Sequence, residues 1–100
     1  MNTVTTTTLS ELTNPVIVDV REPVEYVSGH APTAASIPLG ELVARVEEID
    51  RDDTVYVICE SGGRSAQAVE WLSTQGFDAV NVEGGTSAWR NSGLPVTKGN

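Results

Sequence analysis

The chain of 100 residues has a single cysteine, Cys59, and a single histidine, His30. A lone cysteine cannot close an internal disulfide, and one cysteine with one histidine cannot supply a multi-cysteine zinc site. We therefore expect neither a disulfide framework nor a metal site, and the sequence points to no other cofactor.

Positive charge and long apolar runs are also scarce. Six lysines and arginines stand against 14 aspartates and glutamates, for a formal net charge of −8. This balance argues against nucleic-acid and anionic membrane partners, whose phosphates would be repelled. No segment approaches the roughly 18 apolar residues of a membrane helix.

The amino terminus, MNTVTTTTLSEL, has neither the basic start nor the apolar run of a signal peptide. We therefore expect a cytoplasmic protein. The hydrophobic share of 39% and the charged share of 20% are ordinary for a globular domain. A chain of this length accommodates one domain, which we expect to span residues 1–100.

Short apolar runs alternate with segments of helical periodicity. β-Branched Thr5–Thr8 sits where a first strand could end, and further strands are expected at Pro15–Val20, Ala35–Ile37, Thr54–Ile58 and Ala79–Val82. Between the strands, helices are expected at Arg21–Ser28, around Ala66–Leu72 with Gly76 as its cap, and at Thr86–Asn91 after a turn at Gly84 and Gly85. One more helix is expected where apolar residues recur at a spacing of three and four: Leu39, Leu42, Val43, Val46 and Ile49.

This alternation predicts an α/β fold with a mostly parallel five-stranded sheet and helices on both faces. In such sheets, ligands bind beyond the carboxyl ends of the strands. Cys59 directly follows the strongest predicted strand, Thr54–Ile58.

The segment Cys59–Ser65 reads C-E-S-G-G-R-S and lies between that strand and a predicted helix. Two glycines allow successive amides to turn toward one point, and the following helix adds the positive end of its dipole. Such a cup favours a thiolate, so Cys59 is the candidate nucleophile. The candidate donor-binding residues are the rest of the segment, where Arg64 and the two serine hydroxyls could hold an anionic group: Glu60, Ser61, Gly62, Gly63, Arg64 and Ser65.

Several short motifs then resemble the rhodanese homology domain from about Val4 to Val96. They are D-V-R-E-P-V-E-Y from Asp19, G-H-A-P from Gly29, I-P-L from Ile37, V-I-C-E-S-G-G-R-S from Val57, G-F from Gly76, G-G-T-S-A-W from Gly84 and G-L-P-V from Gly93. The order and spacing of the set make the resemblance specific. Two residues depart from the family pattern: Thr33 replaces a frequent glycine, and Glu60 replaces a neutral or basic residue.

The resemblance implies a three-layer rhodanese-like fold and a sulfurtransferase that carries sulfur as a persulfide on Cys59. The donor would be thiosulfate or a persulfide, and the acceptor cyanide or a thiol, possibly on a protein. With no second cysteine, the acceptor must come from outside the chain. The family also implies a framework role for His30.

Other functions stay open at this point. A rhodanese-like module can act by binding alone, and cysteine-dependent phosphatases also use a loop cysteine with an arginine. Four residues separate Cys59 from Arg64, against five in those phosphatases, which favours a sulfur atom over phosphate. Arg64 either contacts the donor or pairs with Asp19 or Glu25. Asp19 and Arg21 are expected to form an ion pair that braces the loop, and Trp71, Phe77 and Trp89 are expected to pack in or over the core.

Glu60 has three open interpretations. Beside the nucleophile it would repel an anionic donor such as thiosulfate, in solvent it would have no effect, or it would select a neutral or protein-bound persulfide.

Overall fold

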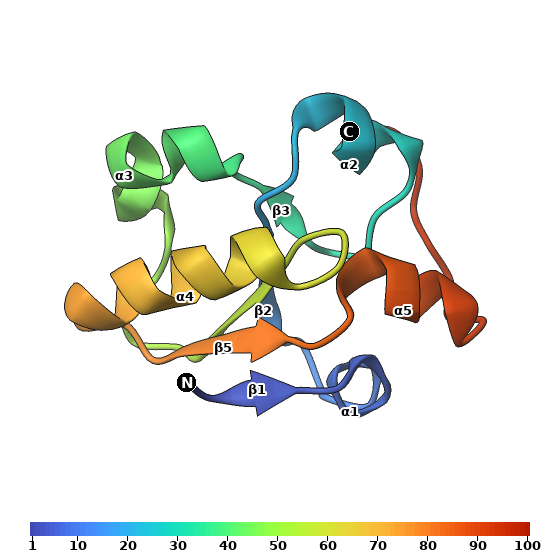
Figure 1. Cartoon of the computed structure of the whole chain (residues 1–100), viewed down its shortest axis with the longest axis horizontal. Helices are drawn as coiled ribbons and strands as arrows, with labels where there is room; N and C mark the ends of the chain where they lie inside the picture. Colours follow the sequence, from blue (N-terminus) through green and yellow to red (C-terminus); the bar gives the residue numbers. More distant parts are fainter.

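A computed structural model describes residues 1–100 and contains one sheet of five short strands. All strand pairs are parallel, and the order across the sheet is β1-β5-β4-β2-β3 (Figure 1). The strands are β1 (Thr3–Val4), β2 (Val16–Asp19), β3 (Ala35–Ser36), β4 (Val55–Ile58) and β5 (Ala79–Val82). The predicted parallel sheet is confirmed at every pair.

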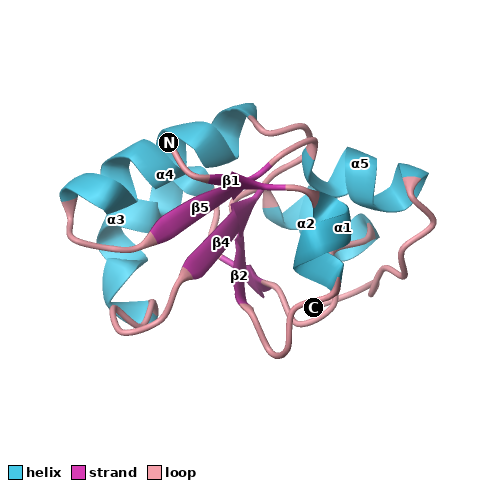
Figure 2. Cartoon of the chain, turned by 90° about the horizontal axis from the view of Figure 1, so that it is seen from below, coloured by secondary structure: helices cyan, strands magenta, loops and turns pink.

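Five helices connect and cover these strands. They lie in two groups, with α3 and α4 on one side of the sheet and α1, α2 and α5 on the other (Figure 2). Their bounds are α1 (Thr6–Ser10), α2 (Pro23–Ser28), α3 (Leu42–Arg45), α4 (Gly63–Thr74) and α5 (Gly85–Asn91). None of them is long and apolar enough to cross a membrane.

The core is divided by the sheet into two apolar clusters, because side chains alternate along each strand. In β4, Val55 and Val57 join the cluster that contains Leu72 of α4. Ile58 points the other way, into the cluster that contains Trp89 of α5. Both clusters are almost fully buried, so the predicted three-layer α/β arrangement is confirmed.

The threonine-rich segment near the amino terminus differs from the prediction. The strand ends at Val4, and Thr6–Ser10 forms α1 instead of continuing the strand. The reason is local: the hydroxyl of Thr5 accepts a hydrogen bond from the amide of Thr8 at 3.1 Å and caps the helix. The helix cap at Thr5 therefore outweighs the preference of the β-branched threonines for a strand.

The helix expected around Leu39–Ile49 is also different, because it is broken into short pieces. The 3₁₀ turns Leu39–Glu41 and Val46–Glu48 flank the four-residue α3. Leu42 and Ile49 are buried as expected, but Val43 is 66% exposed. Backbone angles at Arg45 (φ −112°, ψ 13°) interrupt the helix, so the continuous apolar face ends there.

Other expected features are confirmed. Gly76 follows α4 with a φ of +88°, as a glycine cap requires. Phe77 and Trp89 are buried, and Trp71 packs against the core from a partly buried position.

Candidate active site

Cys59 directly follows β4, at the carboxyl edge of the sheet. On either side, β2 ends at Asp19 and β5 ends at Val82. The topology therefore brings the segments after three strands to one place, where Figure 1 shows the loop before α4 facing the start of α5. The site was expected at this edge from the strand-then-cysteine pattern.

Helix α4 begins earlier than the apolar pattern suggested. It starts at Gly63, so Gly63, Arg64 and Ser65 form its first turn and only Glu60–Gly62 remain as a connecting loop. Gly62 has a φ of +113°, which a side chain would disfavour. This backbone turn directs the amide of Gly62 toward the Cys59 Sγ, at 3.0 Å.

The sulfur is buried, because Cys59 is only 1% exposed. The Ser65 Oγ lies 3.3 Å from the Sγ. Burial raises the pKa of the Cys59 thiol, but hydrogen bonds from the Ser65 hydroxyl and from the amides of Ser65, Gly62 and Ser61 outweigh it, so the pKa lies below its ordinary value. We call these three amides the amide cup; they favour the thiolate over the thiol.

The start of α5 holds the loop from behind. The amides of Thr86 and Ser87 donate to the carbonyls of Cys59 (2.8 Å) and Glu60 (3.0 Å). The Thr86 hydroxyl donates to the same Cys59 carbonyl at 3.0 Å. With these two carbonyls turned toward α5, the following amides are free to face the sulfur.

Gly85 makes this contact possible. A Cβ at this position would lie 2.5 Å from the Cys59 carbonyl oxygen and 2.6 Å from that of Glu60. Gly85 also has a φ of +58°. Glycine is therefore required here both by the backbone angle and by the close approach of the loop.

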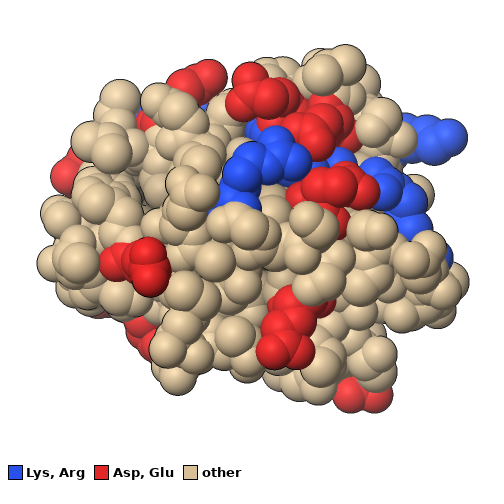
Figure 3. Space-filling view, viewed as in Figure 1, with Lys and Arg blue, Asp and Glu red and all other residues tan.

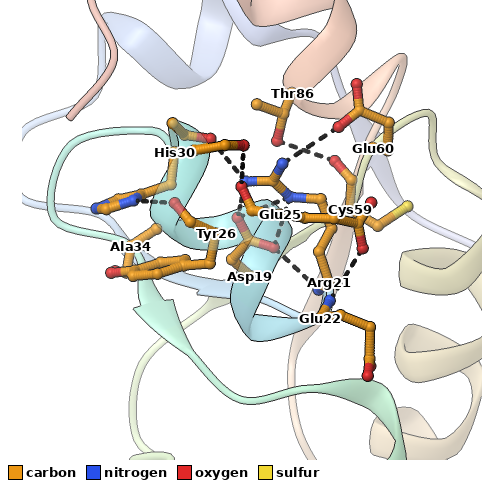
Figure 4. Close-up of polar contacts among 12 residues, drawn as sticks. Asp19, Arg21, Glu22, Glu25, Tyr26, His30, Ala34, Cys59, Glu60 and Thr86 are labelled. Carbon is orange, nitrogen blue, oxygen red and sulfur yellow. Dashed lines mark hydrogen bonds and ion pairs between the residues drawn. The ribbon is translucent and has the colours of Figure 1, made fainter. Parts of the chain in front are cut away.

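Asp19 and Arg21 form the predicted ion pair beneath the loop, with both side chains fully buried. The Arg21 Nη2 lies 2.8 Å from the Asp19 carboxylate and also donates to the Gly29 carbonyl. The Arg21 Nη1 reaches Glu60 at 3.2 Å, so the pair is tied to the loop (Figure 4). A fully buried arginine with all three of its nitrogens bonded is a fixed support for the loop.

Glu60 is held between two arginines. One carboxylate oxygen accepts from buried Arg21, and the other accepts from Arg90 of α5 at 2.9 Å. Figure 3 shows the result on the surface: basic and acidic side chains lie interleaved in one cluster between α2 and α5. Glu60 thus lies next to Cys59 as a partly exposed carboxylate held in two ion pairs, and its effect on the choice of donor stays a prediction.

Arg64 forms a two-pronged ion pair with Glu25 of α2. Its Nη1 and Nη2 lie 2.7 and 3.0 Å from the two carboxylate oxygens. The hydrogen bond from Arg64 lowers the pKa of Glu25 to about 2. Of the two partners expected for Arg64, the structure shows Glu25.

The two serines of the segment occupy different environments. Ser61 is exposed, whereas Ser65 is fully buried and directs its hydroxyl at the Cys59 sulfur and at Asn81. Ser65 therefore lies behind the nucleophile and not at the surface, where a donor would arrive. Donor binding by Glu60, Ser61, Gly62, Gly63, Arg64 and Ser65 stays a prediction.

Sequence reasoning missed three residues that contact the loop: Asn81, Thr86 and Arg90. Asn81 had a signal, because it is the one polar residue in the apolar strand A-V-N-V. Thr86 and Arg90 had none, because their contacts depend on how α5 is placed.

His30 has the framework role that was expected. It is 3% exposed, its Nδ1 donates to the Tyr26 carbonyl at 2.8 Å, and its ring stacks on that of Tyr26. Tyr26 in turn donates to the Ala34 carbonyl (Figure 4). His30 is thus packed against Tyr26 of α2, and it is not among the hydrogen-bond partners of the Cys59 sulfur.

The surface pockets lie away from the sulfur. One of about 380 Å³ is lined by residues of α1, of α5 and of the segment that follows α5, among them Leu9, Trp89 and Leu94. Neither it nor the two other pockets is lined by Cys59 or by another residue of Glu60–Ser65.

Comparisons with known proteins agree with this geometry. The profile of the rhodanese-like domain matches residues 5–92. A protein of Allochromatium vinosum named sulfurtransferase is 38% identical over 89 residues, covering 88% of this chain and 83% of its own. The crystal structure of a rhodanese-related protein from Thermoplasma volcanium is 38% identical, with a TM-score of 0.93 over 97% of this chain and 98% of its own. That of a rhodanese-like domain protein from Staphylococcus aureus is 37% identical, with a TM-score of 0.88 over 98% of this chain and 100% of its own. The match of the rhodanese-like domain to residues 5–92, together with relatives 38% identical over most of the chain, shows that the chain belongs to the rhodanese-like domain family.

Proposed function

We propose that the protein is a sulfurtransferase that carries sulfane sulfur as a persulfide on Cys59. One observation carries the proposal: the buried sulfur accepts hydrogen bonds from the amide cup and from the Ser65 hydroxyl, and these bonds together lower the thiol pKa. A thiolate stabilised in this way is a nucleophile toward sulfur. The name of the Allochromatium vinosum relative, sulfurtransferase, supports the same chemistry.

The reaction has two half-reactions. The Cys59 thiolate attacks the outer sulfur of the donor, a new S–S bond forms, and the donor's own S–S bond breaks with its electron pair leaving on the donor. From thiosulfate the leaving group is sulfite, and from a persulfide it is a thiolate. A thiophilic acceptor then attacks the outer sulfur, and the electron pair of the broken S–S bond returns to Cys59.

The donor and acceptor are limited by the site. The 1% exposure of Cys59 favours a slender terminal sulfur, as in thiosulfate or a persulfide. The chain has no second cysteine, so the acceptor is external: cyanide, a small thiol or a protein thiol. The amide cup can hold the charge on the outer sulfur during both steps.

Phosphate chemistry is less well supported. Both terminal nitrogens of Arg64 are occupied by Glu25, whereas a loop phosphatase needs its arginine on the phosphate. A module that acts only by binding has no need of a stabilised thiolate. Neither alternative has an observation of its own in its favour.

The test is the intact mass of the protein after incubation with thiosulfate or with a small persulfide, then with cyanide. We expect a gain of one sulfur atom from at least one donor and its loss to cyanide. Cys59→Ser is the control, because serine is nearly the same size but forms no persulfide; it should keep the fold and gain no mass. No gain in the native protein with either donor would contradict the proposal.

A further inference from the structure

The hydroxyl of Ser65 has one proton to donate but lies within hydrogen-bond distance of three possible acceptors. Its Oγ lies 3.3 Å from the Cys59 sulfur, 3.1 Å from the Gly62 carbonyl oxygen and 2.5 Å from the Asn81 Oδ1. A hydroxyl has one proton to donate. The carbonyl and amide oxygens can only accept, so the sulfur competes with them for that proton.

The winner of this competition depends on the charge of the sulfur. When Cys59 is a thiol, its S–H can donate to the Ser65 oxygen, and Ser65 donates to Asn81. When Cys59 is a thiolate, it needs the Ser65 proton itself. Ser65 must then turn away from Asn81, and the Asn81 Oδ1 loses its donor.

The amide of Asn81 cannot avoid this loss by flipping. Its Nδ2 lies 3.4 Å from the Gly62 carbonyl oxygen. A flipped amide would place two carbonyl oxygens against each other, which is unfavourable. The orientation that accepts from Ser65 is therefore the preferred one.

Asn81 is unusual for its place in the fold. It is 8% exposed, on a strand otherwise made of apolar residues. A buried amide there is unfavourable unless it is hydrogen-bonded. Its two side-chain hydrogen bonds are with Ser65 in the first turn of α4 and with Gly62 in the preceding loop. The side chain therefore contacts the segment around Cys59 and forms no hydrogen bond within the sheet.

We propose that Asn81 is a positioning residue for the nucleophile: its side-chain oxygen competes with the Cys59 sulfur for the proton of Ser65. Through this competition it governs how readily Cys59 ionises. The thiol proton itself leaves to solvent, and Asn81 gains and loses no proton. Once a persulfide forms, the charge moves to the outer sulfur and Ser65 can return to Asn81.

The charged groups around Cys59 are held in pairs that do not include Ser65 or Asn81. On its own loop and helix these are Glu60 and Arg64, and after β2 they are Asp19 and Arg21. Glu25 of α2 and Arg90 of α5 complete the set. Because Asn81→Leu adds no charge and Asn81 contacts none of these pairs, a shift in ionisation that requires Ser65 is attributable to the Ser65 hydrogen bond.

The test is the rate of Cys59 alkylation by iodoacetamide as a function of pH. Asn81→Leu has a similar size but no acceptor, so we expect the thiol pKa to fall and the alkylation rate below the pKa to rise about twofold to tenfold. Asn81→Asp, a stronger acceptor with added negative charge, should raise the pKa. Ser65→Ala should also raise it, by removing the donor to the thiolate.

The decisive comparison is the double variant Ser65→Ala/Asn81→Leu against Ser65→Ala. Without the hydroxyl there is nothing to compete for, so Asn81→Leu should no longer change the profile. If Asn81→Leu acted only through a loss of packing, it would shift the thiol pKa by the same amount in the native protein and in Ser65→Ala.

The inference is overturned if Asn81→Leu raises the pKa, leaves it unchanged, or shifts it equally without Ser65. If circular dichroism shows that Asn81→Leu does not fold, Asn81→Asp is compared with and without Ser65→Ala: a pKa that is not raised, or that rises equally without the Ser65 hydroxyl, overturns the inference. The inference deepens the proposed sulfur transfer, but alkylation needs no sulfur donor. The two can therefore fail separately.

Discussion

The Thr86 hydroxyl lies 3.0 Å from the carbonyl oxygen of Cys59, across a sequence separation of 27 residues. The backbone of Gly85 is packed so closely on this carbonyl that a Cβ would lie 2.5 Å from it. The shape of the loop that carries Cys59 is therefore fixed by α5, a helix that begins after a different strand.

Replacing Gly85 with alanine should move the loop and reduce sulfur transfer. The added methyl clashes with two backbone carbonyls, and overpacking of this kind destabilises a protein by about 1–3 kcal/mol. Urea unfolding measures the loss of stability, and the rate of thiocyanate formation from thiosulfate and cyanide measures the loss of sulfur transfer. Gly93→Ala is the matched control, because Gly93 has a similar φ of +75° but open space around the new Cβ. Equal losses in both variants would show that backbone strain, and not contact with the loop, is responsible.

Replacing Glu60 with glutamine should raise the efficiency with thiosulfate. The variant removes one negative charge beside the nucleophile and leaves Arg21 and Arg90 with less compensation. A unit charge about 8 Å from an anion is worth roughly 0.5 kcal/mol in water and about 2 kcal/mol at an effective dielectric of 20. The gain in kcat/KM should therefore be about twofold to thirtyfold, and salt should reduce it.

Arg90→Gln removes a positive charge that is paired with the Glu60 carboxylate. The net charge near Cys59 becomes more negative, so the efficiency with thiosulfate should fall. A neutral persulfide donor should be affected by neither variant. A decrease for Glu60→Gln would mean that the carboxylate assists the reaction, and equal gains with both donors would mean that charge is not the cause.

Replacing Asp19 with asparagine should strongly destabilise the fold. The change leaves fully buried Arg21 without its main counter-charge, and breaking a buried pair in this way is worth about 3–5 kcal/mol. Urea unfolding at neutral pH gives the value. Glu48→Gln is the comparison, because it removes one acid from the more exposed Arg45 and should change the free energy of unfolding far less than Asp19→Asn does.

The Glu25–Arg64 pair should contribute stability that depends on pH. The folded-state pKa of Glu25 is about 2, below the ordinary value of 4.5. Its contribution is therefore fully present above about pH 4.5 and is lost as the pH falls toward 2. Comparing the Tm of the native protein with that of Glu25→Gln should show a difference at pH 6 that shrinks across this window. A difference that stays constant down to pH 2 would contradict the ion pair.

The sequence predicted the layers, and the position of Cys59 at the carboxyl end of β4, because both depend on local patterns. The run of β-formers before Cys59 predicts a buried strand, and two glycines after it predict a turn. The helix α1 was missed because its stability comes from one cap, the Thr5 hydroxyl, in a segment whose composition favours a strand.

The partners of the site residues were harder to predict, because they depend on contacts between distant segments. Glu60 could be recognised as unusual, but its two arginines come from the ends of β2 and from α5. Ser65 was considered only as a hydroxyl that could hold the anionic part of a donor, because the helix was expected to begin after it. Once Gly63 begins the helix, Ser65 turns inward to the sulfur.

The loop that carries Cys59 is held largely by other segments of the chain. The carbonyls of Cys59 and Glu60 accept from Thr86 and Ser87, and the Glu60 carboxylate accepts from Arg21 and Arg90. Local opening of this loop would have to break contacts with two other segments at once, so it belongs to the same cooperative folding unit as the sheet. The amide hydrogens of Thr86 and Ser87 should then exchange with deuterium only through global unfolding. The nucleophile's geometry would in that case be as durable as the whole fold.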